Sequence, residues 1–127
     1  MSNHECEACI VTCIDYRLQA NINNWIAQNF KQGSFDRVSL AGGVKNLDVI
    51  LDQIKTSARL HRIKRAVVIN HADCGAYGEE NIPDKETEFL RHNEDLQTIA
   101  NRVRSDLPNL KVETYYLHLD GTFEVVK

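Results

Sequence analysis

Long hydrophobic runs are absent from this 127-residue sequence. The longest run near the middle, residues 66–69 (Ala-Val-Val-Ile), is far shorter than the roughly 20 apolar residues that a membrane-spanning helix needs. An excess of positive charge is also missing, because 15 Lys and Arg stand against 18 Asp and Glu, a formal net charge of −3. We therefore expect neither a membrane protein nor a protein that wraps nucleic acid.

Cysteine is sparse, and its four residues are too few for a scaffold held together by disulfides. The first residues carry Glu5 and Glu7 where a secretory signal has basic residues before an apolar stretch. We therefore expect a cytoplasmic protein, in which cysteines more often bind metal or react than form disulfides. Repeats, linkers and low-complexity segments are lacking too, so the sequence predicts one domain over residues 1–127.

The patterns of apolar residues predict strands that alternate with helices. Short uncharged or β-branched runs are typical of buried strands, and apolar residues at helical spacing are typical of amphipathic helices. A final pair of short runs flanks Asp120-Gly121, a dipeptide that favours the tight turn of a hairpin. The expected strands are residues 9–14, 36–40, 65–70, 112–119 and 122–126, and the expected helices are residues 18–30, 47–58 and 96–107.

This alternation predicts an α/β protein of three layers, because parallel strands joined by helical crossovers leave helices on both faces of the sheet. We expect a mainly parallel sheet in the order 2-1-3-4, with a C-terminal antiparallel hairpin strand. In this order the first and third strands are neighbours where the chain reverses direction, and ligands bind beyond the carboxyl ends of strands at such a point. Cys13 and His71 lie at these two ends.

Two thiols and an imidazole follow these two strands. Cys13 comes from the first strand, and His71 and Cys74 follow the third. Thiolate and imidazole are ligands that zinc prefers, and three protein ligands leave a fourth position open, as catalytic zinc sites do. The sequence therefore predicts a Zn²⁺ site formed by Cys13, His71 and Cys74. The alternative is that these residues only pack in the core.

Asp15 and Arg17 follow Cys13 at alternate positions, which point the same way on an extended segment. A guanidinium holds a carboxylate bidentately, so we expect Arg17 to keep Asp15 ionised beside the metal. Asp15 then either accepts a proton next to the metal or binds zinc itself and blocks the fourth position. A salt bridge that only holds the strand end is the alternative.

Four segments carry a family resemblance, and they stand in this order along the chain: Cys13-x-Asp15-x-Arg17, Ala41-Gly42-Gly43, His71-x-x-Cys74-Gly75 and the hairpin dipeptide Asp120-Gly121. In residue types, order and separation they resemble the β-class carbonic anhydrases. The resemblance implies a zinc lyase, a carbonate dehydratase, that interconverts carbon dioxide and bicarbonate through zinc-bound hydroxide. It also implies that Cys13, His71 and Cys74 bind zinc, and that Asp15 and Arg17 form a catalytic dyad beside it.

The resemblance further implies a homodimer or a larger homo-oligomer, in which the partner chain helps to complete the substrate pocket. We expect Tyr16, Gly42 and Gly43 to line this pocket. Family members usually have Ser or Ala at the position of Tyr16, and they carry a longer N-terminal arm. The chain therefore resembles a short, divergent member of the family.

Two other functions are compatible with the same residues. A hydrolase of carbonyl sulfide or carbon disulfide is compatible with the same scaffold, because the fold does not separate these substrates. In a non-catalytic zinc-binding domain, Asp15 would permanently occupy the fourth ligand position, and the metal would only link the first and third strands. The enzyme hypothesis is the one that the resemblance favours.

A further motif, Cys6-x-x-Cys9, has the spacing of metal ligands or of a redox pair. Together with His4, it suggests a second site or a rival ligand for Cys13. Cys9 begins the predicted strand whose far end holds Cys13, about 13 Å away at 3.3 Å per residue. These two cysteines are therefore not expected to share an ion.

Overall fold

Five strands form one sheet in the computed structural model of this protein. The strands are β1 (Ala8–Thr12), β2 (Phe35–Ser39), β3 (Arg65–His71), β4 (Lys111–Leu117) and β5 (Phe123–Val125), the helices are α1 (Gln19–Asn29), α2 (Leu47–His61) and α3 (Lys85–Asp106), and the short 3-10 turns are η1 (Tyr16–Leu18), η2 (Gly43–Lys45) and η3 (Gly75–Tyr77). The structure describes residues 4–78 and 84–126; residues 1–3, 79–83 and 127 of the expected domain lie outside the described residues.

The strand order is β2-β1-β3-β4-β5. β1 runs parallel to β2 and β3, β3 runs parallel to β4, and β5 pairs antiparallel with β4. These pairings confirm the predicted α/β class, the order 2-1-3-4 and the C-terminal hairpin strand. They also make β1 and β3 neighbours, which is the arrangement that the predicted site needs.

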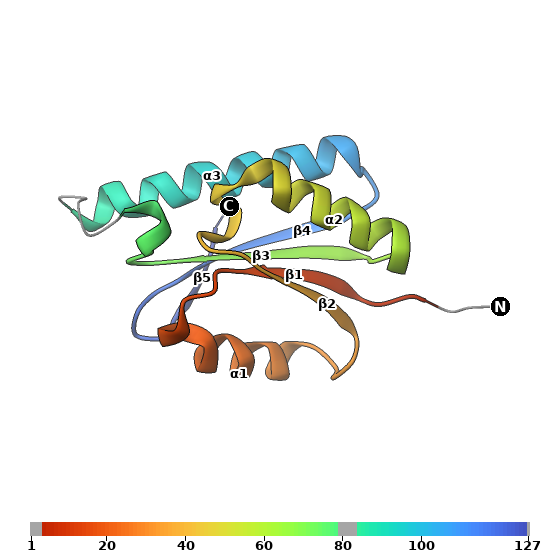
Figure 1. Ribbon diagram of the computed structural model, residues 1–127, viewed down its shortest axis with the longest axis horizontal. Coiled ribbons are helices and arrows are strands. Elements are labelled where there is room, and N and C mark those ends of the chain that lie inside the picture. The colour runs from red at the N-terminus through yellow and green to blue at the C-terminus, as the bar shows by residue number, and fades with distance from the viewer. Residues whose placement is uncertain (1–3, 79–83, 127) are drawn as a thin grey trace.

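Helices cover both faces of the sheet, α1 on one face and α2 with α3 on the other (Figure 1). Alternate side chains of β1 point to opposite faces of the sheet and are buried on both, as in a central strand. Ile10 packs with Ile22 of α1. The next residue, Val11, belongs to the cluster that holds Ile54 of α2 and Leu96 of α3. The three predicted layers are therefore confirmed.

Helix α3 begins at Lys85, well before the predicted start near residue 96. The Asp84 side chain caps it by accepting a hydrogen bond of 2.7 Å from the backbone N–H of Thr87. The first half of the helix buries Phe89 only in part and His92 completely, so its inner face includes a polar residue and has a weak apolar pattern. Within the described ranges, no helix is long and apolar enough to cross a membrane.

The ends of β1 and β3 determine where the predicted ligands lie. β1 ends at Thr12, two residues earlier than predicted, and the Thr12 carbonyl accepts a hydrogen bond of 3.0 Å from the Leu40 N–H. β3 continues through His71, which pairs with Leu117 of β4. Cys13 and His71 therefore sit at the same carboxyl edge of the sheet, Cys13 just after its strand and His71 as the last residue of its own.

Candidate functional site

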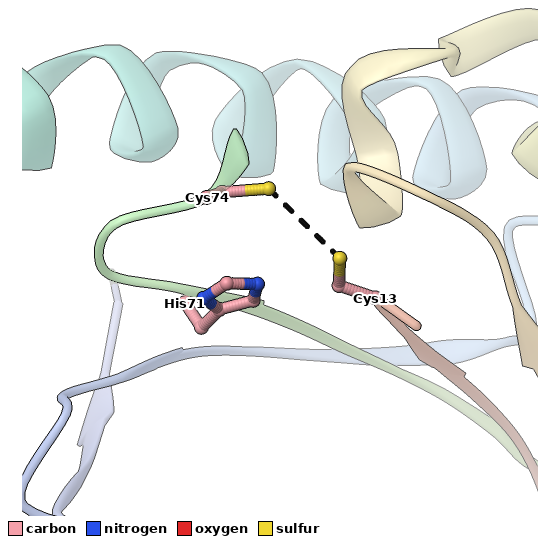
Figure 2. Close-up of side chains that lie close together, drawn as sticks. All are labelled: Cys13, His71 and Cys74. Atoms are coloured by element: carbon pink, nitrogen blue, oxygen red, sulfur yellow. Dashed lines mark hydrogen bonds between the residues drawn. The ribbon is translucent and has the colours of Figure 1, made fainter. Parts of the chain in front are cut away.

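Three donor side chains converge at the carboxyl ends of β1 and β3 (Figure 2). Cys13 comes from the end of β1, His71 from the end of β3, and Cys74 from the turn that precedes η3. Their donor atoms all lie within 4.8 Å of one another, and all three residues are buried. The structure thus brings together the three residues that the sequence predicts as zinc ligands.

The hydrogen bond of the His71 ring identifies the nitrogen that faces the cluster. Nδ1 lies 2.6 Å from the backbone carbonyl oxygen of Ala72. Because a carbonyl oxygen only accepts, Nδ1 carries the proton, and the lone pair of the neutral ring is on Nε2. Nε2 is buried and has no hydrogen-bond partner among the residues that the structure describes. A buried nitrogen in this condition is costly unless a ligand satisfies it.

The two thiols are a coupled pair. The sulfur atoms of Cys13 and Cys74 lie 3.9 Å apart, and the N–H of Gly42 donates a hydrogen bond of 3.3 Å to the Cys13 sulfur. The hydrogen bond from Cys74, aided by that from Gly42, lowers the pKa of Cys13. The same hydrogen bond and burial raise the pKa of Cys74. Without a cation the pair therefore holds one proton, because two thiolates side by side repel.

These residues fit a zinc ion. Tetrahedral zinc with two sulfur ligands at about 2.3 Å places the sulfur atoms about 3.8 Å apart, close to the 3.9 Å between Cys13 and Cys74. A dication also removes the repulsion between two thiolates, and it gives the lone pair of His71 Nε2 a partner. The donor set of two sulfurs and one imidazole nitrogen is typical of zinc rather than of magnesium or calcium.

Arg17 binds Asp15 beside this cluster. The backbone N–H of Arg17 donates to Asp15 Oδ1 at 2.9 Å, and its side-chain Nη2 donates to Asp15 Oδ2 at 2.6 Å. The side-chain hydrogen bonds from Arg17 lower the pKa of Asp15 to about 2. Asp15 is therefore ionised at any pH near neutral. Its Oδ2 atom lies 3.8 Å from His71 Nε2, next to the donor atoms.

Asp73 is a second carboxylate on Arg17. Its Oδ2 accepts a hydrogen bond of 2.9 Å from Arg17 Nη1, and its backbone carbonyl accepts one of 2.8 Å from Nη2. Asp73 is one of the two residues between His71 and Cys74, and it has a positive φ of 56°. The turn between these two donors therefore also anchors the Asp15–Arg17 pair. Residue types along the chain do not reveal this contact, because Asp73 alone has the character of a surface carboxylate.

A surface pocket of about 520 Å³ opens beside the donor set. Tyr16 lines it but is 86% exposed, so its phenol stands toward solvent. Gly42 contributes its N–H to Cys13, whereas Gly43 packs against Asn70, and the residue of this turn that lines the pocket is Ala41. The predicted role of Gly42 and Gly43 toward a substrate stays a prediction.

A buried polar network behind the site is not expected from the sequence, where Tyr77 and His92 resemble ordinary surface polar residues. Asn70 donates to the Tyr77 hydroxyl at 3.1 Å and to His92 Nδ1 at 2.9 Å. Its Oδ1 accepts a hydrogen bond of 3.2 Å from the N–H of Val44 in η2. Burial lowers the pKa of His92 to about 4, so the ring is neutral. Both side chains are buried, so the network is part of the core behind the site.

Comparison with known proteins places the chain in a family. Residues 3–127 match the family described as "Putative carbonic anhydrase". The chain belongs to the carbonic anhydrase family. A relative from Rickettsia bellii (strain RML369-C), named only as an uncharacterized protein, is 31% identical over 136 residues that cover 97% of this chain and 83% of the relative.

Solved β-carbonic anhydrases have the same fold as this chain. A β-carbonic anhydrase, isoform I from Trichomonas vaginalis, has a TM-score of 0.60 and 17% identity over 98% of this chain and 82% of its own. A carbon disulfide hydrolase has a TM-score of 0.61 and 13% identity over 92% of this chain and 77% of its own. At these identities the likeness is one of fold. It agrees with the family match and with a short, divergent member of the β class.

Proposed function

We propose that this carbonic anhydrase family member catalyses the reversible hydration of carbon dioxide to bicarbonate, with Zn²⁺ held by Cys13, His71 and Cys74. The observation that carries the proposal is the Nε2 atom of His71. It is buried, it has no hydrogen-bond partner in the described part of the chain, and it lies within 4.8 Å of two sulfurs that share one proton. Such an arrangement is costly without a cation and stable with one.

Zinc bound to these residues would supply Lewis acidity, which lowers the pKa of water and makes a nucleophile available near neutral pH. Cys13 and Cys74 together bring two negative charges, so they weaken this Lewis acidity relative to an all-imidazole site. The neighbouring residues must therefore contribute more to activation. Asp15 is the group placed to do so.

Asp15 would accept a hydrogen bond from the attacking water at its carboxylate and so orient that water toward carbon dioxide. The bonds from Arg17 keep Asp15 ionised, as the lowered pKa requires, and Asp73 holds Arg17 from the other side. The carboxylate is thus fixed next to the donor set rather than free to swing. From the same position Asp15 could also bind zinc as the fourth ligand in place of water. The hydrogen bonds from Arg17 oppose this.

The pocket suits a small substrate with little polarity. Its apolar lining includes Ile14, Ala41 and Ala76, and the charged side chains of Asp15 and Arg17 also line it. Ile14 is 58% exposed at the rim, an unusual place for a large apolar side chain. We propose that residues 1–127 act as one domain in a cytoplasmic homodimer or larger homo-oligomer, in which a second copy covers this rim.

A hydrolase of carbon disulfide is the second candidate. It is favoured by the likeness in fold to the carbon disulfide hydrolase, at a TM-score of 0.61. The same nucleophile would attack the central carbon of carbon disulfide or carbonyl sulfide. Substrate assays on one preparation separate the candidates, because the favoured activity must exceed the other at equal enzyme concentration.

Stopped-flow measurement of carbon dioxide hydration tests the proposal on the zinc-loaded protein and on an Asp15→Asn variant. We expect the wild-type protein to hydrate carbon dioxide. Asp15→Asn should lose roughly 100-fold or more in kcat/KM while its zinc content stays unchanged. Asp52→Asn, at an exposed carboxylate of α2, is the matched control and should retain full activity. A wild-type protein that binds one zinc per chain here but hydrates no carbon dioxide would favour the non-catalytic zinc domain instead.

A further inference from the structure

A second group of donor side chains lies at the opposite end of the sheet. The donor atoms of Cys6, Asp36 and His61 lie within 4.8 Å of one another. Cys6 comes just before β1, Asp36 is the second residue of β2, and His61 is the last residue of α2. All three belong to the amino edge of the parallel strands, where α2 ends, at the far end of β1 from the candidate active site (Figure 1). The group therefore cannot be part of that site.

Main-chain hydrogen bonds fix these three residues relative to one another. The N–H of Cys6 donates to the carbonyl of His61 at 2.9 Å, and the N–H of Lys64 donates to the carbonyl of Glu7 at 3.0 Å. Helix α2 ends with Arg62 in the left-handed conformation, at φ 50°, which turns the chain back toward the sheet. The segment of Cys6 is therefore bound to the end of α2 by its backbone, independently of its thiol.

Asp36 connects the group through its carboxylate. Its Oδ2 accepts a hydrogen bond of 2.6 Å from the Ser57 hydroxyl and lies 2.6 Å from His61 Nδ1. Burial opposes ionisation of Asp36, but the hydrogen bonds from His61 and Ser57 prevail and lower its pKa. An ionised carboxylate thus stands between an imidazole and a thiol, with Ser57 to orient it.

A simple salt bridge does not account for the Cys6 thiol, which lies beside it and donates a long hydrogen bond of 3.6 Å to the Ala8 carbonyl. Asp36 and His61 alone would form an ordinary ion pair at the end of a helix. Cys6 adds a sulfur, and burial together with the charge of Asp36 raises its pKa. His4, from the same segment as Cys6, stacks its ring on His61 with centroids 6.4 Å apart. Sulfur, imidazole and carboxylate from three elements form a donor set that zinc accepts.

We propose that Cys6, Asp36 and His61 form a second Zn²⁺ site, distinct from the site of Cys13, His71 and Cys74. The cation would replace the proton of the Cys6 thiol and the proton between Asp36 and His61. His4 or a water molecule would supply the fourth ligand. Bound zinc would join the segment before β1 to β2 and to the last turn of α2, and so stabilise the amino edge of the sheet. The proposal does not rest on carbon dioxide hydration.

Zinc content tests this proposal on the full-length protein after dialysis against a chelator of micromolar affinity. The wild type should retain one zinc per chain more than Cys6→Ser, His61→Ala or Asp36→Asn. Cys9→Ala is the matched control, because Cys9 is the other cysteine of the same motif and is absent from the group. It should retain as much zinc as the wild type. Equal zinc in wild type and Cys6→Ser would overturn the proposal, as would loss of the second zinc in Cys9→Ala.

Cobalt substitution and thermal unfolding give two further readouts. Co²⁺ bound at this site should produce a thiolate charge-transfer absorption that Cys6→Ser reduces and Asp36→Asn weakens. Added zinc should raise the Tm of Cys6→Ser less than that of the wild type, because binding to the folded state stabilises it. Carbon dioxide hydration by Cys6→Ser should equal that of the wild type. If absorption and Tm respond alike in both proteins, Cys6 is not a ligand, whatever the hydration assay gives.

Discussion

The Oδ2 atom of Asp15 lies 3.8 Å from the Nε2 atom of His71. This is the nitrogen that carries the lone pair, because Nδ1 donates to the Ala72 carbonyl. The carboxylate that the sequence places two residues after Cys13 is therefore next to the nitrogen of the imidazole that faces the two thiols. Arg17 holds it there through the bond from Nη2 to Oδ2. One ion pair thus places an ionised hydrogen-bond acceptor beside the two thiols and the imidazole.

Asp15 should make the stability of the metal-free protein depend on pH. Its pKa in the folded protein is about 2, below the value of 3.8 in the unfolded chain, because Arg17 stabilises the charge. Ionised Asp15 therefore stabilises the folded state above pH 3.8, and this contribution is lost as the pH falls toward 2. Urea unfolding should show a destabilisation by Asp15→Asn near pH 6 that shrinks at acid pH. A difference that does not change with pH would contradict the lowered pKa.

His92 should weaken the fold in acid over a different range. Its pKa is lowered to about 4 by burial, from 6.5. The unfolded chain therefore takes up a proton at pH values where the folded protein does not. Stability is full above pH 6.5 and should fall by roughly 3 kcal/mol as the pH drops to 4. In His92→Gln this part of the slope should disappear in denaturant titrations, whereas His118→Gln, at a histidine whose side chain is 39% exposed, should retain it.

Gly43 should tolerate no side chain. A Cβ atom there would clash with the Asn70 Oδ1 atom, which accepts the Val44 N–H, and the backbone has a φ of +57°. Gly43→Ala should lower the free energy of unfolding by roughly 1–2 kcal/mol of backbone strain, plus about 1–3 kcal/mol for the disturbed hydrogen bond. Gly33→Ala is the control, because Gly33 has a φ of +74° and open space around it. Equal losses in the two variants would mean that Asn70 moves aside freely.

Removal of metal should leave one reactive cysteine. Hydrogen bonds from Cys74 and Gly42 lower the pKa of Cys13, which makes it a thiolate near neutral pH. Burial raises the pKa of Cys9 to about 11. Iodoacetamide should therefore alkylate Cys13 before Cys9 in the chelator-treated protein, as peptide mass spectrometry can show, and zinc should protect Cys13. Alkylation of Cys13 at the same rate with and without zinc would contradict its role as a ligand.

Much of this arrangement follows from local sequence patterns. The uncharged run at residues 66–69 predicts a central strand, and β3 contains it. The spacing of His71 and Cys74 predicts that one turn presents both donors, as it does. Cys13 reaches them because parallel neighbours end at the same edge of a sheet.

Contacts between distant polar residues could not be predicted in this way. Asp73 accepts a hydrogen bond from Arg17, and Asp36 lies close to Cys6 and His61. In the sequence alone, both aspartates resemble ordinary surface carboxylates. The early start of α3 was missed for a related reason, because its buried face includes His92. Polar residues that bury themselves through tertiary hydrogen bonds leave no apolar periodicity to detect.

X-ray absorption at the zinc edge tests the central claim most directly, on the Cys6→Ser variant so that the second site does not contribute. Two sulfur neighbours at about 2.3 Å and nitrogen or oxygen neighbours at about 2.0–2.1 Å are expected. Adding Cys13→Ser to this variant should reduce the sulfur neighbours to one. A zinc shell of nitrogen and oxygen alone in the Cys6→Ser protein would contradict the assignment of Cys13, His71 and Cys74 as the metal ligands.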